Sequence, residues 1–251
     1  MIPISEIFGP TIQGEGPLVG RRVMFVRTGG CDYRCGMDET TGEWTMPWRC
    51  DTLYAVLPEH KGSWTKMDAG AVLGRLNELS GGERYPVILS GGNPALHQGI
   101  GDLLAHPLAQ GWEFHIETQG TVWPAWASGL TGTGGAPKPP ANRMGFHEER
   151  QRPPAPWMIE APAPHLKIAV ATPEDLVWAC EIADLYPGAP FYLVPCNTEI
   201  ALGGGASPAT VGPGYTRLVD ACLASGAPAA SQRAILLPQL HALAWGTARG
   251  H

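Results

Sequence analysis

Three cysteines near the start of the chain have the residue type and clustering that chemistry at a metal requires. Cys31, Cys35 and Cys50 follow a strand-like run at 23–26, and the chain of 251 residues has six cysteines in all. Three clustered thiolates in a cysteine-poor protein indicate either structural zinc with a fourth ligand or an iron–sulfur cluster. Three protein ligands leave a fourth position open, and in an iron–sulfur cluster a reaction could occur there.

Polar segments after other apolar runs supply further candidates. Gln13-Gly14-Glu15-Gly16 combines an amide and a carboxylate that could read a guanine-like edge, and Arg27 could bind a carboxylate through two N–H groups. Gly91-Gly92 ends an apolar run, where glycine lets a ligand approach the backbone. Glu117 could accept hydrogen bonds from ribose hydroxyls, and Lys138 could be a positioned cation. Each segment alone is equally compatible with a solvated turn or a surface charge.

The composition narrows the class of protein. The formal charge of −6 argues against a partner with a nucleic-acid backbone. The first residues lack the basic start and apolar core of a signal peptide, and no run reaches the roughly 18 apolar residues that span a membrane. We therefore expect a cytoplasmic protein without a membrane partner, in which metal chemistry is a better reading of the cysteine cluster than disulfides. Cys180 and Cys222 fall on apolar helix faces and are expected to be packing residues.

Short apolar runs alternate with helical patterns along the chain. The apolar spacing at 72–79, 176–183 and 215–223 predicts helices, and Thr172-Pro173 marks a helix start with an N-cap and a first-turn proline. The alternation predicts an α/β fold with a parallel sheet, either open or curled toward a barrel. Strands are expected at 22–27, 86–90, 113–117, 166–170, 190–194 and 233–237.

Two Gly-rich segments interrupt this alternation. Residues 128–164 are rich in Pro and Gly and predict a long insertion loop within a single domain, 1–251, and residues 201–214 predict a second loop. In a parallel sheet the residues after each strand gather at its carboxyl edge. Cys31, Ser90 to Gly92, Glu117-Thr118 and 194–197 are therefore expected to meet at one rim.

Taken together, the motifs resemble the 7-carboxy-7-deazaguanine synthase family of the radical S-adenosylmethionine (SAM) superfamily. The segments that carry the resemblance span most of the chain in the family's order. They are Ser5 to Phe8, Ile12 to Gly16, Phe25 to Arg27, Gly30-Cys31, Cys50-Asp51-Thr52, Leu89 to Pro94, Ile116 to Thr121, Ala136-Pro137-Lys138 and Leu237 to His241.

The resemblance implies a radical SAM core, which is an incomplete TIM-like barrel of about six mainly parallel strands. It also implies a site, with Cys31, Cys35 and Cys50 holding a 4Fe–4S cluster and Thr52 a Mg²⁺ ion. The substrate would contact Ile12, Gln13, Gly14, Glu15, Arg27, Ser90, Gln239 and His241. SAM would contact Gly91, Gly92, Asn93, Glu117, Thr118, Ala136, Pro137, Lys138, Val194, Pro195, Cys196 and Asn197.

The implied reaction converts 6-carboxy-5,6,7,8-tetrahydropterin to 7-carboxy-7-deazaguanine with loss of ammonia, in the queuosine and 7-deazapurine pathway. The cluster would pass one electron to SAM, and the resulting radical would take a hydrogen atom from the substrate. Implied partners are an electron donor such as flavodoxin and a second copy of the chain in a homodimer. The alternatives are another radical SAM enzyme, such as a glycyl-radical activase, and a non-catalytic module stabilised by zinc.

Two positions depart from the family's pattern. Fourteen residues separate Cys35 from Cys50 where the family usually has two. Asn93 stands where the family has a glutamate that faces the SAM ammonium group. The asparagine keeps an acceptor oxygen but lacks the charge of the glutamate.

Overall fold

The computed structural model describes residues 1–37, 41–43, 50–139, 160–196, 208–246 and 248–251. The described helices are α1 (Leu53–Val56), α2 (Ala69–Leu79), α3 (Gly99–Ala105), α5 (Pro173–Asp184), α7 (Pro208–Leu223) and α8 (Leu240–Trp245), with short 3-10 turns between them. The strands are β1 (Ile2–Ile12), β2 (Arg22–Thr28), β3 (Thr65–Met67), β4 (Val87–Gly91), β5 (Phe114–Thr118), β6 (Gly132–Gly135), β7 (Pro164–Val170), β8 (Phe191–Pro195) and β9 (Ile235–Leu236).

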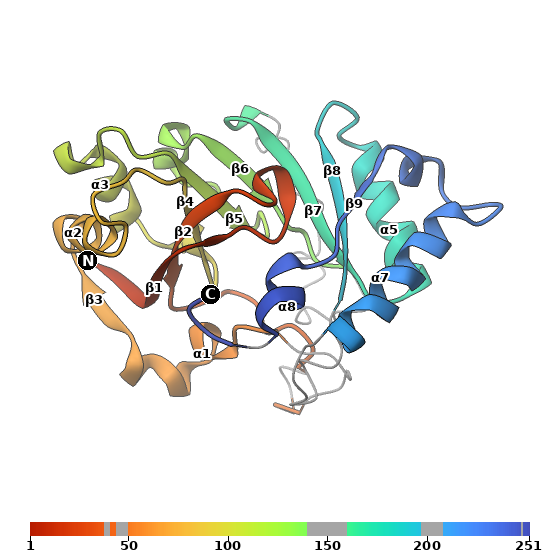
Figure 1. Ribbon diagram of the computed structural model, residues 1–251, viewed down its shortest axis with the longest axis horizontal. Coiled ribbons are helices and arrows are strands. Elements are labelled where there is room, and N and C mark those ends of the chain that lie inside the picture. The colour runs from red at the N-terminus through yellow and green to blue at the C-terminus, as the bar shows by residue number, and fades with distance from the viewer. Residues whose placement is uncertain (38–40, 44–49, 140–159, 197–207, 247) are drawn as a thin grey trace.

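The described strands form one open sheet in the order β3-β1-β2-β4-β5-β6-β7-β8-β9 (Figure 1). Neighbours from β2 to β9 run parallel, whereas β1 runs antiparallel to both β2 and β3. The predicted partial-barrel α/β fold is confirmed, as is each of the expected strands. The sheet has nine strands, whereas about six were expected. The three strands that were not predicted from the sequence are β1, β3 and β6.

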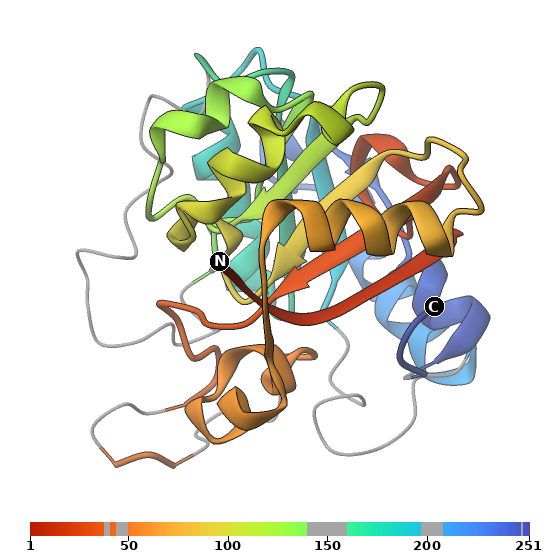
Figure 2. The ribbon, with the colours of Figure 1, turned by 90° about the vertical axis from the view of Figure 1, so that its left-hand side faces the viewer.

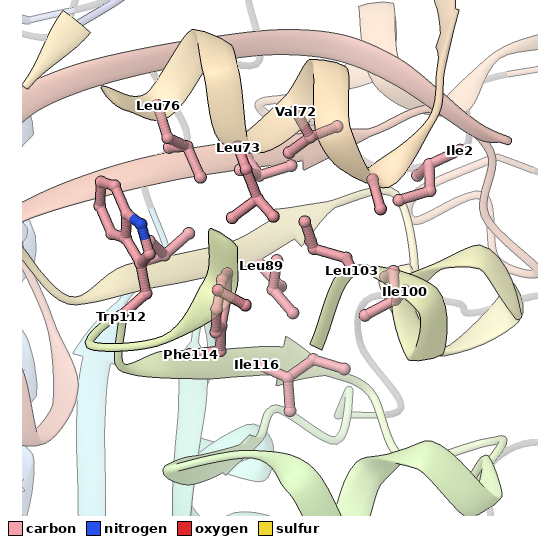
Figure 3. Close-up of a cluster of buried hydrophobic side chains, with 14 of the residues drawn as sticks. Ile2, Val72, Leu73, Leu76, Leu89, Ile100, Leu103, Trp112, Phe114 and Ile116 are labelled. Atoms are coloured by element: carbon pink, nitrogen blue, oxygen red, sulfur yellow. The ribbon is translucent and has the colours of Figure 1, made fainter. Parts of the chain in front are cut away.

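Helices cover the outer side of the curved sheet in two groups. At one end, α2 and α3 pack on β1 and its neighbours, and Figure 2 shows α2 lying along them. Figure 3 shows Val72, Leu73 and Leu76 of α2 directed at Ile100 and Leu103 of α3 and at side chains of the sheet. The apolar face predicted at 72–79 therefore builds this core. Asp68 starts α2 by accepting a hydrogen bond from the Ala71 N–H at 2.8 Å.

At the other end, α5 and α7 cover β7 and β8 and enclose a second core. Thr172 caps α5 as predicted, since its hydroxyl accepts from the Asp175 N–H while the Asp175 carboxylate accepts from the Thr172 N–H. Cys180 is buried in this core and Cys222 packs against it, which confirms their packing role. None of the helices in the described segments is long and apolar enough to cross a membrane.

The structure differs from the predicted loop at 128–164 because residues 132–135 form β6 in the middle of the sheet. β6 was not predicted from the sequence because glycine is uncommon in strands. Glycine is nevertheless required at two of its positions. A Cβ at Gly132 would lie 2.5 Å from His115 Nδ1, and one at Gly134 would lie 2.8 Å from His165 Nε2. The backbone ladder therefore continues from β5 to β7 while two imidazole rings fill the space that side chains on β6 would take.

Two further elements were hidden by residues with low propensity. β1 contains Pro3, Gly9 and Pro10, and its pairing with β2 shifts register between Phe8 and Thr11. Strands tolerate such residues at bulges. The predicted connection at 201–214 is partly wrong, because helix α7 includes residues 208–214. Val211 is buried against α8, so tertiary packing extends the helix through a Gly-Pro-Gly segment.

Candidate functional site

A cavity of about 270 Å³ opens at the carboxyl edge of the parallel strands. Its walls include the ends of β4, β5 and β8 together with the cysteine segment after β2, so the predicted meeting of polar segments at one rim is confirmed. The sequence-predicted residues that line it are Ile12, Gln13, Glu15, Arg27, Cys31, Cys35, Cys50, Thr52, Ser90, Gly91, Gly92, Glu117, Thr118, Ala136, Lys138, Val194, Pro195, Cys196, Gln239 and His241.

Three predicted residues that the structure describes lie outside this lining, and Asn197 falls outside the described residues. A Cβ on Gly14 would lie 2.3 Å from His241 Nδ1, so Gly14 lets that ring approach the backbone. Pro137 lies between two lining residues, Ala136 and Lys138. Asn93, the third, is buried behind the wall.

The Gly91-Gly92 turn allows β4 to end against the cysteine segment. A Cβ on Gly91 would lie 2.2 Å from the Thr28 carbonyl oxygen, and one on Gly92 would lie 2.0 Å from that of Gly30. Gly91 also has φ +119°, which side chains disfavour. These positions accept only glycine, and both residues line the cavity.

The three thiols line the same cavity and are close enough to influence one another electrostatically. Burial raises the pKa of Cys31 to about 11, with opposing smaller effects from its neighbours, and burial followed by neighbouring acidic groups raises the pKa of Cys35 and Cys50. Such thiols stay protonated near neutral pH unless a cation stabilises the thiolates. Within the described segments no three His, Cys, Asp or Glu side chains are close enough to hold a single metal ion. The donor set fits a polynuclear iron–sulfur cluster, which is bound by thiolates.

A buried lysine lies between two carboxylates at the floor of the cavity. Lys167 Nζ is 2.6 Å from Glu15 Oε2 and 2.9 Å from Glu117 Oε1, and the three side chains are 13%, 9% and 23% exposed. Burial would raise the pKa of Glu15, but the ammonium group and the hydrogen bonds outweigh it and lower that pKa to about 2. Burial would likewise lower the pKa of Lys167, yet the two carboxylates raise it well above its usual range. All three groups are therefore charged near neutral pH.

Neutral donors complete this floor. Gln239 Nε2 donates to the second oxygen of Glu15 at 2.6 Å. Gln13 Nε2 donates to Glu117 at 3.2 Å and Ser90 Oγ donates to it at 3.1 Å. Four of the predicted substrate residues, Gln13, Glu15, Ser90 and Gln239, thus form one network with Glu117 and Lys167. The alternative of a solvated turn at Gln13 to Gly16 is wrong, because Gln13 and Glu15 are both buried.

Arg27 lines the cavity and is held by an ion pair and two aromatic rings. Its Nε donates to Glu6 Oε1 at 2.9 Å, and the Tyr54 hydroxyl donates to the same oxygen at 2.6 Å. The guanidinium carbon lies 5.7 Å from the centre of the Phe8 ring and 5.9 Å from that of Phe25. The arginine is thus a positioned, partly buried cation that lines the cavity, rather than a surface charge.

Comparison with known proteins identifies the family of this chain. The 7-carboxy-7-deazaguanine synthase of Bacillus subtilis is 34% identical over 253 residues, which cover 99% of this chain and 98% of that protein. The enzyme of the same name from Bacillus cereus is 35% identical over 254 residues, with coverage of 99% and 98%. The chain belongs to the 7-carboxy-7-deazaguanine synthase family. The predicted radical SAM lyase is therefore confirmed, in preference to the activase and the zinc module.

The fold of this chain is also similar to the folds of solved structures. The crystal structure of QueE from Escherichia coli superposes with a TM-score of 0.52 and 23% identity, covering 77% of this chain and 82% of that one. Streptococcus suis SuiB bound to its precursor peptide gives a TM-score of 0.51 and 13% identity, covering 79% and 45%. No family model matches the chain.

Sequence reasoning missed Lys167 and the polar network behind the wall. A lysine within an otherwise apolar strand was the available signal for Lys167, but its partners are 152 and 50 residues away in the chain. Asn93, which is 0% exposed, donates to Asp32 at 2.9 Å and accepts from Thr118 at 2.9 Å. In this synthase the side chain at position 93 is thus committed to internal partners.

The substitution Asn93→Glu is expected to destabilise the fold. It would place a second carboxylate against Asp32 and remove buried hydrogen bonds, each costing about 1–3 kcal/mol when its partner is left unsatisfied. Urea unfolding measures the change. The double variant Asp32→Asn with Asn93→Glu removes the repulsion and should recover part of the stability. A single variant as stable as the parent would show that the loop accommodates the charge elsewhere.

Proposed function

We propose that this chain converts 6-carboxy-5,6,7,8-tetrahydropterin to 7-carboxy-7-deazaguanine with loss of ammonia. The observation that carries the proposal is the convergence of Cys31, Cys35 and Cys50 with the Glu15–Lys167–Glu117 floor on one cavity. The relatives that match nearly the full chain bear the name of the product. We take residues 1–251 as one radical SAM domain.

The three cysteines would hold three irons of a 4Fe–4S cluster, and SAM would bind beside it. Together these groups supply one-electron cleavage of a sulfonium bond when bound. Lys138 and the backbone of Gly91 and Gly92 lie on the same cavity and are suited to the polar groups of SAM. The other residues assigned to SAM are Asn93, Glu117, Thr118, Ala136, Pro137, Val194, Pro195, Cys196 and Asn197, of which Asn93 would act only through its neighbours.

The Glu15–Lys167–Glu117 floor and Arg27 line the same cavity, and both would orient the pterin. Glu15 is ionised and accepts hydrogen bonds, so it can receive the N–H groups of a pterin edge, and Gln13 can both donate and accept. Arg27 keeps its terminal N–H groups for the substrate carboxylate because Glu6 engages its Nε atom. Ser90, Gln239, His241 and Ile12 also line the cavity and would complete the pterin site, whereas Gly14 would act through His241, whose ring it lets approach the backbone.

Thr52 is proposed to ligate Mg²⁺. Its hydroxyl lines the cavity, 3.2 Å from Cys50 Sγ, and a hard cation prefers such an oxygen together with substrate oxygen. The variant Thr52→Ala should raise the Mg²⁺ concentration needed for half-maximal activity while leaving iron and sulfide content unchanged. A Mg²⁺ titration of initial rate measures this, with Thr41→Ala as an exposed control. An unaltered titration curve would remove Thr52 from the metal site.

The decisive experiment supplies the anaerobically reconstituted protein with SAM, reductant and the pterin. Mass spectrometry should detect 7-carboxy-7-deazaguanine, and its formation should require all three. A protein that holds a full cluster and cleaves SAM but yields no deazaguanine would overturn the assigned substrate.

We further propose a cytoplasmic homodimer that receives electrons from a donor such as flavodoxin. Support comes from the resemblance alone. Sedimentation velocity tests the assembly, since a single species at the monomer mass of 26.7 kDa would exclude the dimer. Replacing dithionite with reduced flavodoxin tests the donor.

A further inference from the structure

Hydrogen bonds converge on Asp32 beside Cys31, and the binding assignments above use neither Asp32 nor Gln119. Gln119 Nε2 lies 2.8 Å from Asp32 Oδ1 and 3.2 Å from Cys31 Sγ. Asn93 Nδ2 lies 2.9 Å from the same Asp32 oxygen, and the Thr121 hydroxyl donates to the other one. Among the described residues, three side chains donate to Asp32, and one of them, Gln119, also reaches the sulfur.

The directions of these hydrogen bonds are fixed by groups that cannot exchange roles. The backbone N–H of Ala95 can only donate, and it donates to Asn93 Oδ1, so the NH₂ group of Asn93 must face Asp32. The Asp32 carboxylate can only accept. A flipped Gln119 amide would set its oxygen against that carboxylate. The Gln119 NH₂ group therefore faces Asp32, and its second hydrogen is left for Cys31 Sγ.

We propose that Gln119 is a positioning residue for Cys31, held by Asp32 so that its amide donates to the sulfur and raises the reduction potential of the cluster. The inference depends on the proposed function only through the cluster itself. A donor to a ligating sulfur stabilises the reduced cluster, which is the more negative state, and so raises the potential. Tyr33 supplies a second donor, but from its backbone N–H at 3.4 Å. Gln119 is therefore the donor that a substitution can remove.

The test compares clusters in the absence of SAM. Gln119→Met keeps the length of the side chain and removes the N–H groups, whereas Gln110→Met makes the same change at an exposed position. After iron and sulfide content have been matched, redox titration followed by electron paramagnetic resonance gives the midpoint potential. We expect a shift to more negative potential for Gln119→Met and no shift for Gln110→Met. An unshifted Gln119→Met would overturn the inference.

A second measurement needs only the parent protein. With glutamine labelled with ¹⁵N in its side chain, electron–nuclear double resonance of the reduced cluster should show a ¹⁵N coupling and a proton coupling that is lost in D₂O. Absence of the ¹⁵N coupling from a fully loaded cluster would overturn this inference and leave the proposed function intact. A parent protein without iron and sulfide would overturn the proposed function first.

Discussion

A Lys167→Met variant is expected to lose both stability and activity. Removal of the ammonium group would leave Glu15 and Glu117 buried without their counter-charge, and breaking a buried ion pair in this way costs about 3–5 kcal/mol. The two carboxylates would also lose the orientation proposed for reading the pterin. Activity should fall to background at substrate concentrations that saturate the parent, as mass spectrometry of the product would show.

The loss of stability should depend on pH in a defined direction. In the parent, the lowered pKa of Glu15 contributes stability that is complete above its ordinary pKa of 4.5 and is lost as pH falls through about 2. The raised pKa of Lys167 contributes stability that is complete below its ordinary pKa of 10.5 and is lost as pH rises through the higher folded value. In the variant, burial and mutual repulsion should raise the pKa of one carboxyl group. The stability difference from the parent should therefore be smaller at about pH 5 than at about pH 8.

Thermal unfolding at these two pH values measures the difference. Lys66→Met removes an exposed lysine on β3 and serves as the control with no pH-dependent change. Lys167→Arg keeps the positive charge and should recover part of the stability. If Lys167→Met lost the same stability at both pH values, the charge network would not be its cause.

A Cys50→Ala variant is expected to lose the cluster and, with it, all product formation. Fourteen residues separate Cys50 from Cys35, so the third ligand depends on the chain returning to the cavity, and the structure places Cys50 on its wall. Two remaining thiolates should not retain a four-iron cluster. The measurement is the visible absorbance and the iron and sulfide content after anaerobic reconstitution.

Two controls separate ligation from general damage. Cys222 packs against the core under α5 and α7 and does not line the cavity. The variant Cys222→Ala should therefore keep the full cluster. Cys196→Ala tests the other thiol that lines the cavity, and it should also keep the cluster. Full iron and sulfide content in Cys50→Ala, lost when Cys196 is also replaced, would reassign the third ligand to Cys196.

Much of the sheet was predictable because each parallel strand is a local property of the chain. Val87, Ile88 and Leu89 form an apolar run because β4 is buried on both faces, so the pattern is visible without knowledge of any neighbour. The rim followed from the rule that parallel strands present their carboxyl ends together. β6 could not be found in this way, since its glycines reflect the rings of His115 and His165 on adjacent strands.

Most of the predicted residues line one cavity, but the hydrogen bonds between them were not predictable from the sequence. The motifs assign Gln13, Glu15 and Gln239 to substrate binding, which stays a prediction, and they carried no sign that Lys167 joins Glu15 to Glu117. The role of Asn93 was similarly hidden, because its side-chain partners Asp32 and Thr118 lie 61 and 25 residues away in the chain. Local motifs identify which residues belong to a site. The hydrogen bonds between those residues can be assigned only when the residues that the fold brings next to them are known.

The open sheet constrains how two molecules could associate. An open sheet has two free edges, and at each of them a strand from another molecule could add. Here the edge strands β3 and β9 are three and two residues long, so they offer few backbone groups for such pairing. The proposed dimer is thus expected to join through side chains on helices or loops rather than through a continuous intermolecular sheet, and concentrated solutions should resist fibrous aggregation.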